Sequence, residues 1–333
     1  MTLKRVCVVG AGTIGSLCAA HLGAVAEVSV LTRRPEHAEA LREEGLRVSG
    51  RTERHVRVRA SHDAGDLGDA DLVVVACKAT QLDEVAARLE GRFASATMMT
   101  IQNGLGVEET LVRHGPWPVI SAVTFMSGTR HGDTHVEYEL DTATWMGPYA
   151  GTGTPFSTVA ETCRLFVASG LQAEAMPDLV PAQWSKLVFN SAVNSVAALT
   201  GLPHVEEYVR EEALTDLGHV VRALVDEGVG VARALGVALH EDPWEMNLRA
   251  VAQGETARAA YAHLPSMLED VLARRPTEVD AICGALVRKA GEAGVPAPLT
   301  AAVYRLVKAK ESSWRRPAPA GVAAAGLAGG ATA

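Results

Sequence analysis

Near its start the chain reads Val6-Cys7-Val8-Val9-Gly10-Ala11-Gly12-Thr13-Ile14-Gly15, an apolar strand followed at once by the pattern G-x-G-x-x-G. In such a loop Gly10 allows a tight turn, Gly12 lets a pyrophosphate approach the backbone, and Gly15 lets the next helix pack on the strand. The helix N-terminus adds unpaired N–H donors and the positive end of the helix dipole. A glycine-rich turn without a ligand is the alternative, but the strand before it and the helix after it favour a dinucleotide-binding unit.

The residues after the second strand indicate which dinucleotide binds. The strand over 27–32 should end beside the adenine ribose, where a carboxylate would bind a 2′-hydroxyl. The sequence has Arg33 and Arg34 there instead, and a guanidinium binds phosphate through its planar fork of donors. We therefore expect NADP(H) rather than NAD(H) as the cofactor, with Arg33 as the first candidate for the 2′-phosphate and Arg34 as the second. A solvated basic pair at a helix start is the alternative.

Length and composition exclude several classes of protein. The chain has 333 residues, enough for two domains with a sizeable core. Its formal net charge is −8, and it has no basic stripe with interleaved aromatic residues, which argues against a nucleic-acid partner. The five cysteines are scattered and form no C-x-x-C pair, so we expect no disulfides, no metal site and a cytoplasmic location. We also expect no signal peptide and no membrane span.

Strands and helices alternate through the first half of the chain. Strands are expected over 3–9, 27–32, 71–76 and 97–101, and helices over 14–24, 36–45, 80–90 and 155–169. Residues 46–60 indicate a two-stranded ribbon, and residues 118–147, with a bend at Gly132-Asp133, indicate an antiparallel extension of the sheet. The predicted fold class is α/β, a Rossmann-type doubly wound sheet with an antiparallel extension, in a domain of residues 1–177.

The second half of the chain has a different pattern, because long segments with a helical period replace the alternation. Helices are expected over 178–200, 205–235, 243–260, 262–275, 277–293 and 297–311. We therefore predict an all-α C-terminal domain of residues 178–316. Residues 317–333 are rich in Ala, Gly and Pro and carry no charge, so a disordered tail is expected there.

Two polar side chains follow buried strands of the predicted sheet. Lys78 comes just after the strand over 71–76, and Asn103 just after the strand over 97–101. Ligands of open α/β sheets bind outside the carboxyl ends of the strands, in the crevice that the glycine loop also faces. Each residue alone is more typical of a surface lysine or an Asn-Gly turn. Together they indicate a binding crevice, with Asn103 near the nicotinamide ribose or the reacting oxygen.

The first helix of the second half carries a polar stripe. Lys186, Asn190 and Asn194 are spaced i, i+4, i+8 in a segment that is otherwise largely apolar. Polar groups inside such a helix need hydrogen-bond partners, and Asn is a mediocre helix former. An exposed stripe or a network between helices is the alternative, but we favour a stripe that faces a ligand.

A third polar signal surrounds Pro276, which should interrupt a helix. Thr277 and Asp280 resemble a capping box that starts the next helix, which would place Glu278 in its first turn. Taken alone, Glu278 is then a charge that the helix dipole favours.

These segments in combination resemble the ketopantoate reductase family (2-dehydropantoate 2-reductase). The motifs that carry the resemblance are GAGTIG, CKATQ, QNG, WSKLVFNSAVN, PSMLEDV and TEVDAICGALV. They extend over nearly the whole chain up to about Arg316. The resemblance implies a Rossmann-type domain and a helical C-terminal domain that close over a cleft.

The resemblance also implies roles for individual residues. Lys186 matches the catalytic general acid, and Glu278 matches an acid that supports catalysis and substrate binding. Residues that match cofactor-binding positions are Gly10, Ala11, Gly12, Thr13, Ile14, Gly15, Arg33, Lys78 and Asn103. Residues that match substrate-binding positions are Asn103, Lys186, Asn190, Asn194, Ser266 and Glu278.

The implied activity is the NADPH-dependent reduction of 2-dehydropantoate, a small 2-oxo acid substrate, to pantoate on the route to coenzyme A. Three features depart from the family pattern, and one of them is that Pro276 precedes the Thr277-Glu278 pair. His263 stands where some members have an Asn that contacts the substrate, and the segment 123–126 with Phe125 is more apolar than the usual Thr-rich stretch. A paralogue that reduces another 2-oxo acid or a specialised-metabolite ketone is therefore kept as an alternative. An NADP(H)-binding sensor without turnover is a further alternative, against which the presence of Lys186, Asn190 and Glu278 argues. The oligomeric state stays open, with a homodimer among the alternatives.

Overall fold

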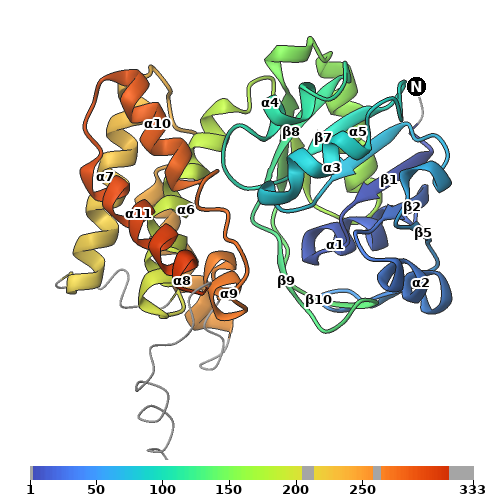
Figure 1. The fold of residues 1–333 in the computed structure, drawn as a ribbon, viewed down its shortest axis with the longest axis horizontal. Helices are drawn as coiled ribbons and strands as arrows, with labels where there is room; N and C mark the ends of the chain where they lie inside the picture. Colours follow the sequence, from blue (N-terminus) through green and yellow to red (C-terminus); the bar gives the residue numbers. More distant parts are fainter. Residues whose placement is uncertain (1–2, 205–213, 258–263, 315–333) are drawn as a thin grey trace, which may run out of the picture.

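The computed structural model describes residues 3–204, 214–257 and 264–314, with the backbone alone for 252–257. Figure 1 shows two parts side by side, one built on sheets and one of helices only. We propose the boundary between them at residues 177 and 178, where the last strand of the sheet part gives way to a long helix. The predicted tail over 317–333 lies outside the described residues.

The sheet part is organised around an eight-stranded sheet in the order β12-β11-β8-β7-β6-β1-β2-β5. From β5 to β8 neighbouring strands are parallel, and the chain order along this run is that of a doubly wound dinucleotide-binding sheet. β11 pairs antiparallel with β8 and forms the predicted extension. The bounds are β1 (Arg5–Val9), β2 (Glu27–Leu31), β5 (Arg59–Ser61), β6 (Leu72–Val75), β7 (Thr97–Thr100), β8 (Val119–Thr124), β11 (Thr144–Pro148) and β12 (Ala173–Ala175).

A second sheet of four strands, in the order β4-β3-β10-β9, corrects part of the prediction for residues 118–147. The expected hairpin with its bend near Gly132 is present, but it leaves the large sheet and pairs with the ribbon that follows helix α2 (Pro35–Glu44). The side chains Val136 and Tyr138 of the hairpin are buried in the core, and their burial stabilises its pairing with the second sheet rather than with β8. The bounds are β3 (Leu46–Gly50), β4 (Arg54–Val56), β9 (Ser127–Arg130) and β10 (His135–Leu140).

Both faces of the large sheet are buried, and β1 shows why. Val6 and Val8 join one hydrophobic cluster, while Cys7 and Val9 join the other. Successive side chains of a strand point to opposite faces, so a continuous apolar strand requires a cover on each side. Helices supply the cover, and α4 is the one helix of the sheet part that the sequence did not predict. The bounds are α1 (Thr13–Leu22), α2 (Pro35–Glu44), α3 (Leu82–Arg88), α4 (Val107–Val112) and α5 (Phe156–Ala168).

The helical part is arranged around α6, which packs against the five other helices described there and is buried along most of its length. The bounds are α6 (Val180–Thr200), α7 (Asp216–Ala234), α8 (Pro243–Ala257), α9 (Ser266–Leu272), α10 (Cys283–Ala293) and α11 (Pro298–Ser313). The predicted helices over 205–235, 243–260 and 262–275 are partly confirmed, and the parts of them over 205–213 and 258–263 lie outside the described residues. The six helices that the structure describes in this part thus correspond to predicted segments.

The predicted helix over 277–293 is wrong in its first turn and a half. Residues 277–282 form turns, and the helix begins only at Cys283. The backbone N–H and the hydroxyl of Thr277 both donate to the Glu311 carboxylate, at 2.8 and 2.6 Å, so Thr277 is tied to α11 instead of starting a helix. Glu278 therefore lies in a turn before α10 and not in the first turn of that helix, so the helix dipole does not explain its position.

Candidate functional site

The glycine loop between β1 and α1 has the geometry of an anion-binding turn. Gly10 has a φ of +98°, and a β-carbon there would lie 2.8 Å from the backbone nitrogen of Cys77, so no other residue fits. A β-carbon on Gly15 would lie 1.9 Å from the carbonyl oxygen of Gly10. At Gly12 it would meet no atom within 4 Å, so the space beside the helix N-terminus is open. The three glycines of the loop thus have the tight turn, the close packing and the open space that the sequence predicts for them.

The two arginines after β2 differ in their surroundings. The guanidinium of Arg34 donates twice to the Asp133 carboxylate, at 2.6 and 2.7 Å, from the turn between β9 and β10. Arg33 is exposed and makes no ion pair with any residue that the structure describes. Of the two candidates for a 2′-phosphate, Arg33 is therefore the one whose guanidinium is not engaged by a described carboxylate. Asp133, the partner of Arg34, was not predicted from the sequence.

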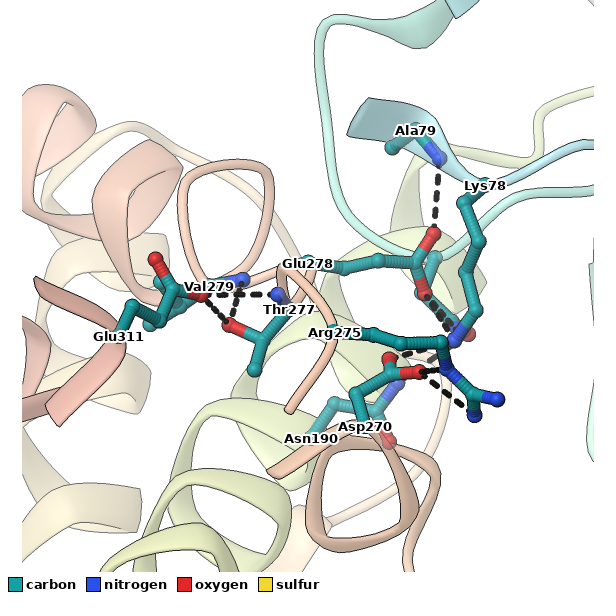
Figure 2. A network of polar contacts seen from close by, with 10 residues as sticks. Lys78, Ala79, Asn190, Asp270, Arg275, Thr277, Glu278, Val279 and Glu311 are labelled. Carbon is teal, nitrogen blue, oxygen red and sulfur yellow. Dashed lines mark hydrogen bonds and ion pairs between the residues drawn. The ribbon is translucent and has the colours of Figure 1, made fainter. Parts of the chain in front are cut away.

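Glu278 connects the helical part to the ends of two strands of the large sheet (Figure 2). Its Oε1 accepts a hydrogen bond of 2.9 Å from the backbone N–H of Ala79, just after β6. Its Oε2 accepts one of 3.0 Å from the side-chain amide of Asn103, just after β7. The loop of Asn103 approaches closely because Gly104 follows it, where a β-carbon would lie 2.2 Å from the carbonyl oxygen of Ala281. Asn103 and Glu278, two of the predicted site residues, are thus in direct contact.

Lys78 forms the second connection between the parts. Its Nζ lies 2.7 Å from Oδ2 of Asp270 on α9 and 4.0 Å from Oε2 of Glu278. Asp270 is 2% exposed and also accepts a 3.2 Å hydrogen bond from Arg275 (Figure 2). Burial opposes the charge on Lys78, but the two carboxylates outweigh it and raise its pKa. Asp270 lies in the PSMLEDV motif but was not among the predicted site residues, although an acid four positions after Ser266 on a short helix was a signal.

Lys186 lies on α6 and is almost fully enclosed. Its Nζ donates to the carbonyl oxygen of Thr124 at the end of β8 and lies 5.0 Å from the centre of the Phe125 ring. Burial lowers the pKa of Lys186 to about 8, and the carboxylate of Glu278 acts in the opposite direction. At neutral pH the side chain is therefore a charged donor whose proton is held less tightly than that of an ordinary lysine.

The remaining residues of the predicted set lie on α6 and α9. Asn190 follows Lys186 by one turn and donates to Oδ1 of Asn103 over 3.4 Å, so the polar stripe of α6 reaches the Asn103–Glu278 pair. Asn194, one turn further, is 7% exposed and makes no side-chain hydrogen bond within the part of the chain that the structure describes. Ser266 opens α9 and is half-buried. His263 lies outside the described residues.

The comparisons with known proteins place this chain in a family. Residues 6–151 match the family described as "Ketopantoate reductase PanE/ApbA", and residues 178–311 match its C-terminal counterpart, "Ketopantoate reductase PanE/ApbA C terminal". The chain belongs to the ketopantoate reductase family. The 2-dehydropantoate 2-reductase of Archaeoglobus fulgidus is 31% identical to it over 313 residues, which are 94% of this chain and 99% of that protein.

Solved structures agree with the assignment to the ketopantoate reductase family. A PanE/ApbA family ketopantoate reductase from Ralstonia eutropha JMP134 has a TM-score of 0.82 and 26% identity, over 94% of this chain and 100% of that one. A D-mandelate dehydrogenase in complex with NADH and anilino(oxo)acetate also has a TM-score of 0.82, over 93% of this chain and 99% of that one. Its identity of 21% shows a shared fold alone.

Membership in this family makes the chain an oxidoreductase that acts on a CH–OH group. The alternative of a sensor without turnover is thereby set aside, and the predicted fold class is confirmed. In the described portions of the chain no three His, Cys, Asp or Glu side chains gather as metal ligands. Of the helices that the structure describes, none is both long enough and apolar enough to span a bilayer.

Proposed function

We propose that this ketopantoate reductase family member reduces 2-dehydropantoate to pantoate with NADPH, on the route to coenzyme A. The observation that carries the proposal is the enclosed ammonium of Lys186, on the same face of α6 as Asn190, which contacts the Asn103–Glu278 pair. That pair lies at the carboxyl ends of β6 and β7, the edge of the sheet where ligands of this fold bind.

The glycine loop would hold the pyrophosphate of the cofactor, and Arg33 would hold its 2′-phosphate. The residues that contribute are Gly10, Ala11, Gly12, Thr13, Ile14 and Gly15, together with Arg33, Lys78 and Asn103. The open space at Gly12 and the exposed guanidinium of Arg33 support this assignment. When bound, the reduced nicotinamide supplies a hydride to the ketone carbon.

Lys186 would act as the general acid of the reduction. Negative charge develops on the ketone oxygen as the carbon is reduced, and an enclosed ammonium stabilises it more strongly than water does. A pKa of about 8 suits the subsequent proton transfer, because general acids work best when their pKa lies near the working pH. Glu278 would keep Lys186 protonated by its charge and bind substrate together with Asn190, Asn194, Ser266 and Asn103.

The test is an assay of NADPH oxidation with 2-dehydropantoate and a panel of other 2-oxo acids. Lys186→Ala should lower kcat at least about 100-fold, the lower end of the usual effect of a general acid, with little change in the Kd of NADPH. Lys289→Ala is the matched control, since the side chain of that lysine is 39% exposed and pairs with Glu292 on α10. A kcat of Lys186→Ala within a few-fold of the parent enzyme would show the assignment to be wrong.

A second candidate substrate is a 2-oxo acid with a bulky apolar group. The rings of Trp145 and Phe189 lie edge-on to Phe125, at 6.1 and 5.9 Å, so an aromatic wall stands beside the Lys186 amine. The structurally similar D-mandelate dehydrogenase was crystallised with anilino(oxo)acetate, which carries a ring beside its oxo acid group. If this candidate holds, phenylglyoxylate will give a higher kcat/KM than 2-dehydropantoate, and Phe125→Thr will reverse the order.

A further inference from the structure

The hairpin of β9 and β10 brings a third arginine to the predicted cofactor site. β9 packs beside α1, and it ends at Arg130. The Nη1 atom of Arg130 lies 3.4 Å from the carbonyl oxygen of Ala11, the second residue of G-x-G-x-x-G. A cationic side chain from a position 119 residues later in the chain therefore lies on the glycine loop.

The charge of Arg130 is only weakly neutralised by protein groups. Among the described residues, the carboxylate that pairs with it is that of Asp133, at 3.8 Å, which is beyond hydrogen-bond distance. That carboxylate is already engaged by Arg34 at 2.6 Å. The Arg130 side chain is 39% exposed, so its other guanidinium N–H groups are free to turn toward an anion on the loop.

We propose that Arg130 binds the pyrophosphate of the cofactor, as a second arm opposite the N-terminus of α1. A pyrophosphate carries two charged groups, and the helix N-terminus offers N–H donors from one side. A guanidinium supplies charge-assisted hydrogen bonds from the other side, roughly twice as strong as neutral ones. The inference rests on the proposed function to the extent that the loop binds a nicotinamide dinucleotide.

The position of Arg130 separates this role from recognition of the 2′-phosphate. Arg130 touches the backbone of the glycine loop, whereas Arg33 follows β2, where the adenine ribose is bound in this fold. The pyrophosphate is common to NADPH and NADH, and the 2′-phosphate belongs to NADPH alone. The two arginines should therefore differ in which cofactor each one affects.

The experiment measures the Kd of NADPH and of NADH by fluorescence titration, without substrate. Arg130→Ala should raise both values by the same factor, about tenfold or more for the loss of a charge-assisted contact. Arg33→Ala should raise the value for NADPH alone. Arg222→Ala is the matched control, because that exposed arginine pairs with Asp226 on α7 and should change neither value.

Arg130→Lys keeps the charge without the planar fork, so its Kd values should lie between those of the parent and Arg130→Ala. This variant also carries the test if thermal unfolding shows that Arg130→Ala does not fold. Values within twofold of the parent for both cofactors, a loss confined to NADPH, or a parent chain that binds neither cofactor would overturn the inference. Turnover of 2-dehydropantoate is a separate readout, so failure of the substrate assignment leaves these binding results interpretable.

Discussion

The carboxylate of Glu278 accepts a 3.0 Å hydrogen bond from the side-chain amide of Asn103, across 175 positions of the sequence. The other carboxylate oxygen accepts from the backbone N–H of Ala79. One side chain of the helical part therefore holds two strand-end loops of the sheet part. The same charge also opposes the effect of burial, which lowers the pKa of Lys186 to about 8. The placement of the two loops is thereby coupled to the proton donor.

Glu278→Gln should lower kcat and shift its pH dependence. The amide of the variant has one acceptor oxygen, so either the backbone N–H of Ala79 or the side-chain amide of Asn103 would face an NH₂ group. The lost hydrogen bond should lower the free energy of unfolding by about 1–3 kcal/mol. Without the charge of Glu278 the pKa of Lys186 falls below about 8, and the decline of kcat for reduction at alkaline pH begins at lower pH. Measurement of kcat between pH 6 and about pH 10 checks the shift. Glu278→Asp keeps the charge and should retain the position of the alkaline limb; an unchanged limb in Glu278→Gln would contradict the coupling.

Lys186→Met should stabilise the folded protein at neutral pH. The pKa of Lys186 is lowered from 10.5 to about 8 on folding, so the burial of its charge costs roughly 3 kcal/mol below pH 8. Between the two pKa values the unfolded chain holds the extra proton, so the free energy of unfolding of the parent rises with pH. The advantage of Lys186→Met should therefore be largest below pH 8 and vanish near pH 10.5.

Urea unfolding at a series of pH values measures this difference. Lys78→Met is the matched comparison, because the pKa of Lys78 is raised by its carboxylate partners and its removal should destabilise the fold. A free energy of unfolding of Lys186→Met at or below that of the parent at neutral pH would show that the buried charge of Lys186 has no energetic cost.

The choice between NADPH and NADH should depend on Arg33 and Asp133. Arg33→Ala removes the exposed guanidinium and should raise the Kd of NADPH about 10- to 100-fold. Asp133→Asn removes the carboxylate that holds Arg34, so Arg34 becomes available and NADPH should bind more tightly relative to NADH. The ratio of the two Kd values is the measurement, and a lower preference for NADPH in Asp133→Asn would contradict this account.

Asp270→Asn should destabilise the contact between the two parts. Asp270 is 2% exposed and pairs with Lys78 and Arg275, whose side chains are 39% and 59% exposed. Water can solvate the two cations once the charge is lost, so we expect a loss of about 1–2 kcal/mol in the free energy of unfolding, below the 3–5 kcal/mol for a fully buried pair. Glu292→Gln breaks the exposed pair with Lys289 and should cost about 0.5 kcal/mol or less. Equal losses in the two variants would show that the Asp270 pair is an ordinary surface contact.

Much of the fold was predictable because the relevant signals are local. The strand-turn-helix at Gly10–Gly15 depends on neighbouring residues, and so does the stripe of Lys186 and Asn190 on α6. The hairpin of β9 and β10 was predicted as a hairpin but assigned to the wrong sheet. Its partner strand β3 lies far away in the sequence, and nothing in the hairpin itself specifies that pairing.

The sequence by itself determined the doubly wound sheet, the helical second part and the residue types of the site, since periodicity, glycine positions and spacing express them within short segments. Only the tertiary structure decided which side chains meet. Asp270 pairs with Lys78 across 192 positions of the sequence. Asp133 pairs with Arg34 rather than with Arg33. The guanidinium of Arg130 contacts the carbonyl oxygen of Ala11. These contacts arise from the packing of distant segments against one another, and the same packing encloses Lys186 and lowers its pKa.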